Sequence, residues 1–325
     1  MKTFLALMVL ACMLLSCTSS SGNIEGMSDT QTFVLEDIFM MSVDEGWSVG
    51  YAADVKSLVP YGLVMHYQGG KWVKDYQTDF PGRLKSVWMT SARKGWAVGS
   101  GGILEFSNGM WRQVYQSKDT VQDVFMLNEY EGWAVGNDGL IVHYQLGKWA
   151  DFPSSTTNSL RSVYLGRDGN GWAVGQGGII MRYLNGVWSL SSSPTSIDIN
   201  GVYLGSDGTG WAVGGNLVGP VFNTLLHLDG FSWKVTDNPS NLPLKSIQVL
   251  SKDQAWAVGG GSVADGRGNS SDRAVILHYD KGIWINNSVN GITDLKGIYM
   301  TSPDEGWAVG NFSVLRYKNN KWERY

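Results

Sequence analysis

Short runs of alternating hydrophobic and polar residues recur along most of the chain, and turn residues bound each run. Residues 84–90 (LKSVWMT) form one run, residues 96–99 (WAVG) form the next, and two further runs follow across a short turn. Elsewhere the last two runs meet at Asn185 and Gly186, a strong hairpin signal because both positions tolerate positive φ. Alternation with a period of two predicts β-strands. The pattern therefore predicts units of four short antiparallel strands.

This unit is repeated seven times. The string GW(A/S)VG, or the variant QAWAVG, marks the second strand of each unit, and a second tryptophan follows it. Fourteen of the fifteen tryptophans therefore occupy repeat positions, and the fifteenth, Trp88, lies in a first strand. At the fifth position of that strand six units carry an aromatic residue, and Gln248 is the exception. One unit cannot bury both of its faces alone, so these side chains are expected to pack between neighbouring units.

Seven units of about 41 residues, each with four strands, predict an all-β fold, namely a seven-bladed β-propeller of four-stranded antiparallel blades. The last unit ends in its own fourth strand at residues 322–325, so closure of the ring needs no strand from the N-terminus. Residues 27–34 are still free to add one. The propeller is expected over residues 35–325, with blades at approximately 35–76, 84–116, 121–151, 160–190, 199–237, 244–286 and 295–325.

The N-terminus is typical of an export signal. Residues 1–16 (MKTFLALMVLACMLLS) carry one lysine and an apolar run that is too short for a comfortable membrane span, which predicts a signal peptide. The run leads into Cys17 in a way that resembles the bacterial lipoprotein cleavage box, and this resemblance implies lipidation of Cys17. Residues 17–34 would then hold the lipidated cysteine and a flexible polar tether. An ordinary signal peptide containing a plain thiol is the alternative.

Composition and charge exclude several classes of protein. With 43% hydrophobic and 17% charged residues, the chain can bury a large core, which excludes wholesale disorder. A net charge of −4 argues against a nucleic acid as partner. Both cysteines lie within the first 17 residues, so the propeller has no cysteine metal site. The histidines share one strand position in four different units, too far apart to hold one metal; they are His66, His143, His227 and His278. We expect no metal and no cofactor.

The repeat resembles that of the BNR-type propellers, which include the photosystem II stability and assembly factor group and many exported bacterial relatives. The resemblance rests on GWAVG, a glycine-containing turn, an I/L-x-x-Y strand and GxW, and it covers about residues 35 to 325. It implies a propeller fold and a role in assembling or maintaining a complex. The Asp-box of that family is absent, because its aspartate position holds Tyr67, Phe106, Tyr144, Tyr183, Leu228, Tyr279 and Tyr317. WAVGGG at residue 256 gives a second resemblance, to kelch propellers.

Positions that differ between units are the best candidates for function, since positions shared by all units serve the fold. The second residue of each first strand is expected near the axis, at the mouth of the central channel. In order, these residues are Glu36, Lys85, Gln122, Arg161, Asn200, Lys245 and Lys296. Convergent positive charge in a concave site attracts anions. Lys85, Arg161, Lys245 and Lys296 are therefore candidate ligand-binding residues for an acidic partner segment or an anionic glycan.

Insertions between the second and third strands supply further candidates. They begin near residues 51, 215 and 260, in units that are contiguous around a closed ring, and strand alternation places them on the face that carries the channel mouth. Neutral variation of surface loops is the alternative explanation. The candidate ligand-binding residues in these insertions are Asp54, Asp265, Arg267, Asp272 and Arg273.

The sequence thus favours a noncatalytic cell-envelope lipoprotein that binds a protein or glycan partner, as an assembly or maintenance factor. The chain would be exported and anchored by lipid to the bacterial membrane or cell surface. A glycoside hydrolase or lyase is the alternative, with its site on the insertion face. That reading requires two of the insertion carboxylates, at Asp54, Asp265 and Asp272, to stand about 5 to 10 Å apart across a cleft. A purely structural surface protein is a third possibility.

Overall fold

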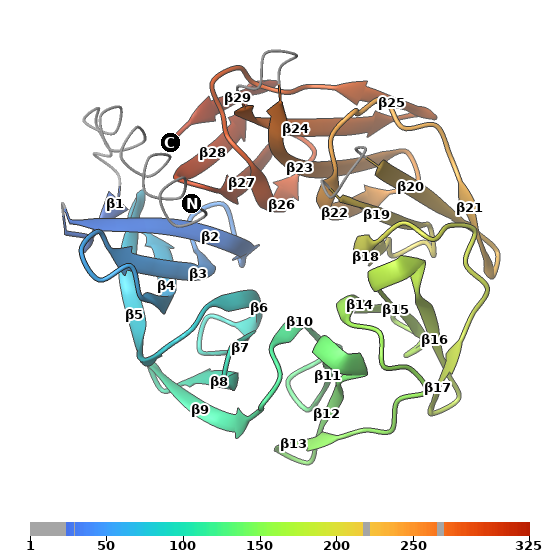
Figure 1. Ribbon diagram of the computed structural model, residues 1–325, viewed down its shortest axis with the longest axis horizontal. Helices are drawn as coiled ribbons and strands as arrows, with labels where there is room; N and C mark the ends of the chain where they lie inside the picture. Colours follow the sequence, from blue (N-terminus) through green and yellow to red (C-terminus); the bar gives the residue numbers. More distant parts are fainter. Residues whose placement is uncertain (1–23, 29, 217–221, 265–269) are drawn as a thin grey trace, which may run out of the picture.

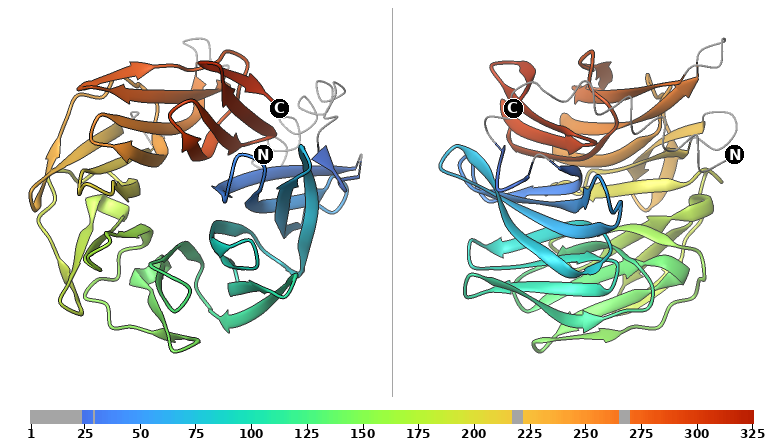
Figure 2. Two further views of the ribbon diagram at one scale, coloured as in Figure 1. Left: turned by 180° about the vertical axis from the view of Figure 1, so that it is seen from behind. Right: turned by 60° about the vertical axis from the view of Figure 1, so that its left-hand side comes forward.

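Seven β-sheets, each with four antiparallel strands, surround one central axis in the computed structural model of the protein (Figure 1). The structure describes residues 24–28, 30–216, 222–264 and 270–325. Figure 2 shows the same ring from behind and from the side. The prediction of an all-β, seven-bladed propeller is confirmed. Within the described residues, no helix has the length and apolar character needed to cross a membrane.

In every blade the first strand lies nearest the axis and the fourth lies at the rim (Figure 1). Blade 1 consists of β2 (Gln31–Met40), β3 (Gly46–Asp54), β4 (Pro60–Gln68) and β5 (Lys71–Pro81). Blade 2 consists of β6 (Leu84–Ser91), β7 (Lys94–Gly99), β8 (Gly102–Ser107) and β9 (Met110–Gln116). Blade 3 consists of β10 (Val121–Met126), β11 (Glu131–Gly136), β12 (Ile141–Gln145) and β13 (Lys148–Asp151). A 3-10 turn, η1 (Asn137–Gly139), follows β11.

Blades 4 to 7 repeat this arrangement. Blade 4 consists of β14 (Leu160–Leu165), β15 (Gly171–Gly175), β16 (Ile180–Leu184) and β17 (Val187–Leu190), and blade 5 consists of β18 (Ile199–Leu204), β19 (Gly210–Asn216), β20 (Phe222–Asp229) and β21 (Ser232–Val235). Blade 6 consists of β22 (Leu244–Ser251), β23 (Gln254–Ala264), β24 (Ser270–Asp280) and β25 (Ile283–Asn286). Blade 7 consists of β26 (Leu295–Ser302), β27 (Glu305–Gly310), β28 (Ser313–Lys318) and β29 (Lys321–Arg324). A second 3-10 turn, η2 (Gln176–Gly178), follows β15.

The repeated tryptophans hold neighbouring blades together. In blade 5, Trp211 of β19 packs edge-to-face against Trp284 of β25 in blade 6, with ring centroids 5.1 Å apart and an interplanar angle of 89°. Four other blade interfaces contain the same pair in nearly the same geometry. Each such pair contributes about 0.5 to 1.5 kcal/mol to stability, in addition to the effect of burying its apolar surface. These tryptophans therefore serve the fold, as the repetition predicts.

Every innermost strand contains a β-bulge at the second residue of the repeat pattern, which is Glu36 in the longer strand β2 and the second residue of the other six strands. In blade 4, Leu160 pairs with Gly175 and Ser162 pairs with Val174, so Arg161 has no partner on β15. The same shift recurs in the other six blades. A bulge interrupts the alternation of a strand and changes the direction of the side chains around it. As a result, the second and third residues of the innermost strands both line the axis.

The final glycine of GWAVG is required by the close approach of the two strands at this bulge. A Cβ atom on Gly175 would lie 2.0 Å from the carbonyl oxygen of Ser159, and the equivalent glycine of each other blade has a carbonyl oxygen within 2.4 Å of the same point. No side chain fits at such a distance. The glycine therefore allows the bulge that shapes the centre of the ring.

Packing between the first and last blades closes the ring. Blade 7 supplies all four of its own strands, as expected from the sequence. Residues 31–34 lengthen β2, whereas β1 (Ile24–Glu25) pairs in parallel with β5 at the rim of blade 1. Tyr67 and Trp72 of blade 1 contact Trp307 of blade 7, with ring centroids 4.8 and 5.7 Å apart.

The insertions of blades 1 and 6 lengthen strands. Tyr51–Asp54 extends β3, and Pro60–Gly62 extends β4. In blade 6, β23 and β24 pair from Gln254 and Asp280 outward to Ala264 and Ser270. The longer strands of these blades are visible beside the short strands of blades 3 and 4 in Figure 1.

Candidate functional site: the axial cavity

A cavity of about 620 Å³ lies on the axis of the ring and is lined by the innermost strands. Three layers of side chains form its wall, contributed by the second, third and fifth residues of these strands. We call them the mouth, the middle layer and the floor. Close to the mouth, Gly215, Asn216 and Gly260 also line the cavity. They belong to the second strands of blades 5 and 6, where two of the insertions begin.

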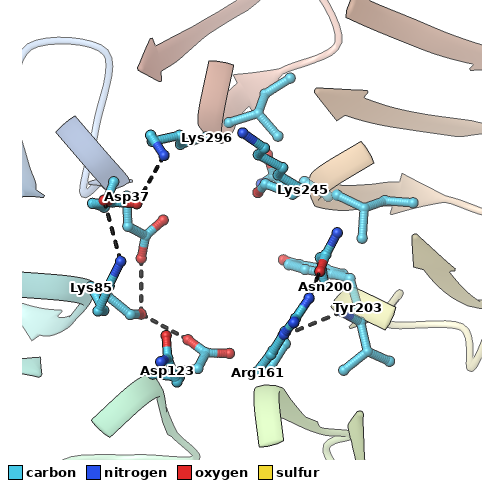
Figure 3. A pocket seen from close by; sticks show the side chains of 18 of the residues that line it. Asp37, Lys85, Asp123, Arg161, Asn200, Tyr203, Lys245 and Lys296 are labelled. Carbon is cyan, nitrogen blue, oxygen red and sulfur yellow. Dashed lines mark hydrogen bonds and ion pairs between the residues drawn. The ribbon is translucent and has the colours of Figure 1, made fainter. Parts of the chain in front are cut away.

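The mouth contains the four basic residues singled out in the sequence, namely Lys85, Arg161, Lys245 and Lys296 (Figure 3). The bulge places each of them, because an unpaired second residue is free to point toward the axis. Gln122 and Asn200 occupy the same position in blades 3 and 5. The structure therefore brings the four candidate cations to one cavity.

The cations of the mouth form ion pairs with Glu36 and with two further carboxylates. Glu36 lies between Lys85 and Lys296, with N–O distances of 3.3 and 3.4 Å. Asp294 pairs with Lys245 at 2.5 Å and with Lys296 at 3.8 Å. On the other side, Arg161 pairs with Asp198 at 2.7 Å.

Charge and burial act in opposite directions on these groups. Burial by itself would raise the pKa of Glu36, but Lys85 and Lys296 outweigh it and hold the pKa below its usual value. Burial lowers the pKa of Lys245, and Asp294 opposes that shift. Four cations thus face three carboxylates, which leaves only a small positive excess at the mouth.

The middle layer contains two carboxylates bridged by one hydroxyl. Ser86 Oγ lies 2.9 Å from Asp37 Oδ2 and 2.7 Å from Asp123 Oδ1. Each carboxylate also accepts a hydrogen bond from the backbone of the following blade. Asp37 accepts one from the N–H of Val87 at 3.0 Å, and Asp123 accepts one from the N–H of Val163 at 2.9 Å. Burial and the charge of Asp123 raise the pKa of Asp37 to about 7, and burial also raises the pKa of Asp123.

Aromatic side chains form the floor of the cavity. A continuous series of ring contacts, with centroids 4.2 to 5.1 Å apart, runs through Tyr299, Phe39, Trp88, Phe125, Tyr164 and Tyr203. Gln248 takes the remaining position, where its amide bonds to the backbone of Met300 in place of an aromatic contact. The cavity is therefore a funnel with a charged mouth and an aromatic floor.

Three of the candidates in the insertions lie in the part of the chain that the structure describes; they are Asp54, Asp272 and Arg273. Asp54 ends β3, where its carboxylate accepts hydrogen bonds from the Lys56 N–H at 2.8 Å and the Thr30 hydroxyl at 2.9 Å. These bonds lower the pKa of Asp54. Asp272 and Arg273 lie on β24 opposite Ser262 and Gly261. The remaining candidates lie outside the described residues; they are Cys17, Asp265 and Arg267.

The histidines have a packing role. His66, His143 and His278 stack on the tryptophan of the neighbouring strand with ring centroids 4.3, 4.0 and 3.9 Å apart. His227 lies tilted against Trp211 at 4.5 Å. Among the described residues, no three His, Cys, Asp or Glu side chains are grouped so that they could hold a metal ion.

Sequence reasoning missed four carboxylates of the cavity. Asp198 and Asp294 directly precede their innermost strands, and Asp37 and Asp123 occupy the third position of theirs. Within one repeat, these residues look like ordinary polar residues at a strand start. A comparison of third positions around the ring would have provided a signal, since only blades 1 and 3 carry a carboxylate there.

Comparisons with known proteins support the fold. No family model matches the chain, and no curated protein does. Among solved structures, "YCF48 bound to D1 peptide" is similar with a TM-score of 0.65 and 17% identity, over 89% of this chain and 93% of that chain. YCF48 from Cyanidioschyzon merolae is similar with a TM-score of 0.60 and 18% identity, over 89% and 96%.

The extracellular domain of the hybrid two-component system BT3049 from B. thetaiotaomicron also shares the architecture. Its TM-score is 0.64 at 14% identity, over 93% of this chain and 41% of that chain. At these identities the similarity shows a common fold alone. The chain is a seven-bladed β-propeller of the architecture found in YCF48 and in a bacterial extracellular domain.

Proposed function

We propose that this protein is a noncatalytic binding propeller that receives a short segment of a partner protein in the axial cavity. The charged and aromatic funnel of about 620 Å³ carries the proposal. Its size lies within the usual range of ligand pockets, which is about 300 to 1,000 Å³. The solved structure of YCF48 bound to D1 peptide adds support, because it is a propeller of the same architecture with a peptide as its ligand.

The charges of the mouth favour a protein segment over an anionic glycan. A polyanion would approach the carboxylates of Glu36, Asp198 and Asp294 together with the cations, and like charges at close range are unfavourable. A segment with one or two acidic groups suits the small positive excess. Polar groups of its backbone can bond to the remaining N–H donors of Arg161, and an apolar side chain can cover the aromatic floor.

The cellular setting of the proposal comes from the N-terminal sequence. The expected signal peptide and the lipid anchor at Cys17 would place the propeller outside the cytoplasm, attached to a membrane. In that setting, a propeller that holds a segment of an envelope protein would act as an assembly or maintenance factor, as the family resemblance implies.

Site-specific photo-crosslinking in cells tests this proposal. A photoreactive residue at Gln122 would face the mouth, and the same residue at Leu146, a side chain 91% exposed on the β12–β13 hairpin of the same blade, is the matched control. We expect an envelope protein to be cross-linked from position 122 only. Cross-linking from both positions, or of no protein from position 122, would contradict the proposal.

A second variant separates recognition by the mouth from simple proximity. Removing cations alone would leave carboxylates buried without partners, so both members of each ion pair are replaced. The changes are Lys85→Gln, Arg161→Gln, Lys245→Gln and Lys296→Gln with Glu36→Gln, Asp198→Asn and Asp294→Asn. A control with the same change in net charge, at exposed positions, combines Lys118→Gln, Lys148→Gln, Lys252→Gln and Lys321→Gln with Glu129→Gln, Asp304→Asn and Glu323→Gln. The cross-link should be lost only in the first variant.

A further inference from the structure

Asp37, Ser86 and Asp123 come from three successive blades and meet on one side of the cavity, opposite Lys245 and Asn200 (Figure 3). The hydroxyl of Ser86 has a single hydrogen, but it lies within hydrogen-bond distance of both carboxylates. If both carboxylates were ionised, one of the two contacts would join two acceptors. Both contacts are hydrogen bonds only when Ser86 donates to one carboxylate and accepts from the other, protonated one.

Among the residues that the structure describes, none supplies a paired positive charge that would take the place of that proton. In the innermost strands around the pair, the ionisable side chains are Glu36, Lys85, Arg161, Lys296, Tyr164 and Tyr299. The three cations among them make their ion pairs with Glu36, Asp198 and Asp294. The second strands packed against this layer have no ionisable residue between their tryptophan and final glycine. Among the described residues, no Lys, Arg or His forms an ion pair with Asp37 or Asp123.

The pair also joins the blades mechanically. Asp37 bonds across to the backbone of β6, Asp123 bonds across to the backbone of β14, and Ser86 connects the two. One proton therefore completes a series of hydrogen bonds that runs through blades 1, 2, 3 and 4. Repulsion between two ionised carboxylates would act at the centre of this series.

We propose that Asp37 and Asp123 share one proton through Ser86, and that this proton is a pH-sensitive link that holds the innermost strands of blades 1 to 4 together. It also sets the charge of the cavity. With the proton present, the pair adds one negative charge, which balances the small positive excess of the mouth; without it, the lining becomes negative. The inference does not depend on the identity of the ligand or on the proposed binding function.

The link has a defined effect on stability. The folded protein holds the proton up to a pH near 7, whereas an aspartate in the unfolded chain loses it near pH 4. Between these values the folded state binds more protons than the unfolded state, so stability falls as the pH rises. Because unfolding releases this one proton, each unit by which the pH rises within this window increases the unfolding equilibrium constant about tenfold. Above pH 7 this contribution no longer changes.

The test is urea unfolding of the full chain at a series of pH values from 4.5 to 8.5. We compare the wild type with Asp37→Asn, Asp123→Asn and Ser86→Ala, and with Asp237→Asn, an exposed aspartate in the link after β21, as control. The readout is the slope with pH, since each substitution also removes a hydrogen bond and lowers stability at every pH. We expect each aspartate variant of the pair to lose the tenfold rise per unit, and the control to retain it.

Carbon-13 NMR of labelled aspartate carboxyl groups in the wild type gives an answer that does not need the variants to fold. We expect one carboxyl resonance of the wild type to titrate near pH 7. In a folded Asp37→Asn or Asp123→Asn variant, no aspartate resonance should titrate there. Titration of every aspartate below pH 5, or equal slopes in the wild type and in a folded Asp37→Asn variant, would overturn the shared proton.

Discussion

Trp88 in blade 2 and Tyr164 in blade 4 contact each other past the intervening blade 3, with ring centroids 6.2 Å apart and an interplanar angle of 68°. Trp88 also packs against Phe39 and Phe125 of its two neighbouring blades. This side chain therefore belongs to three blade interfaces at once. It is the one tryptophan outside the shared repeat positions, and the structure assigns it to the floor of the cavity.

Replacement of Trp88 should open the floor. We expect Trp88→Ala to lower the free energy of unfolding by about 2 to 4 kcal/mol, because a large partly buried side chain is lost and the ring cannot contract to fill the space. Trp88→Phe retains an aromatic ring, as Phe39 and Phe125 do at this position, and should cost less. Urea unfolding of both variants measures the difference. Equal stability of Trp88→Ala and the wild type would show that the floor is not packed.

Gly175 should tolerate no side chain. A Cβ at this position would lie 2.0 Å from the carbonyl oxygen of Ser159, so Gly175→Ala must displace one of the two strands at the bulge. We expect this substitution to lower the free energy of unfolding by about 3 kcal/mol or to prevent folding. Gly186→Ala is the control, since Gly186 has a φ of 84° and no neighbouring atoms within 4 Å. That change should cost about 1 kcal/mol. Similar losses in both variants would contradict the steric role of Gly175.

The ion pair of Lys245 and Asp294 should have a larger coupling energy than an exposed pair. The side chains of Lys245 and Asp294 are only 27% and 10% exposed, whereas those of Lys234 and Asp229 are 65% and 63% exposed. Lys245→Met should cost about 2 to 4 kcal/mol, because Asp294 would keep its charge with only the more distant Lys296 as partner. A double-mutant cycle with Asp294→Asn measures the coupling energy. In the Lys234–Asp229 cycle we expect a smaller coupling energy, because solvent screens that exposed pair.

His143 should make the protein less stable in acid. Burial lowers the pKa of His143, and Glu131 opposes this shift only in part. The unfolded chain therefore binds a proton near pH 6.5 that the folded chain takes up only at lower pH, so stability is lost as the pH falls below about 6.5. His143→Gln should reduce this loss. Stability rises with pH through His143 and falls with pH through the Asp37–Asp123 pair. His143→Gln and Asp37→Asn should therefore change the dependence of stability on pH in opposite directions.

The sequence by itself determined the fold of this protein. Seven copies of one four-strand pattern, each with buried positions on both faces, can satisfy those faces only by packing copy against copy in a ring. The role of the tryptophans and the position of the four cations near the axis also follow from strand order. Each of these properties depends on residues within one repeat, and one repeat can be read directly from the chain.

Only the tertiary structure decided what the axial cavity is. Lys245 meets Asp294 and Arg161 meets Asp198 across blade boundaries, about 40 to 50 positions apart in sequence, and the pairing exists only when the ring is formed. The bulge that brings both second and third residues to the axis breaks the alternation from which strands are recognised. For the same reason Ser86 could not be placed between Asp37 and Asp123 in advance. The charges of the cavity, and the proton we assign to it, arise from contacts between repeats.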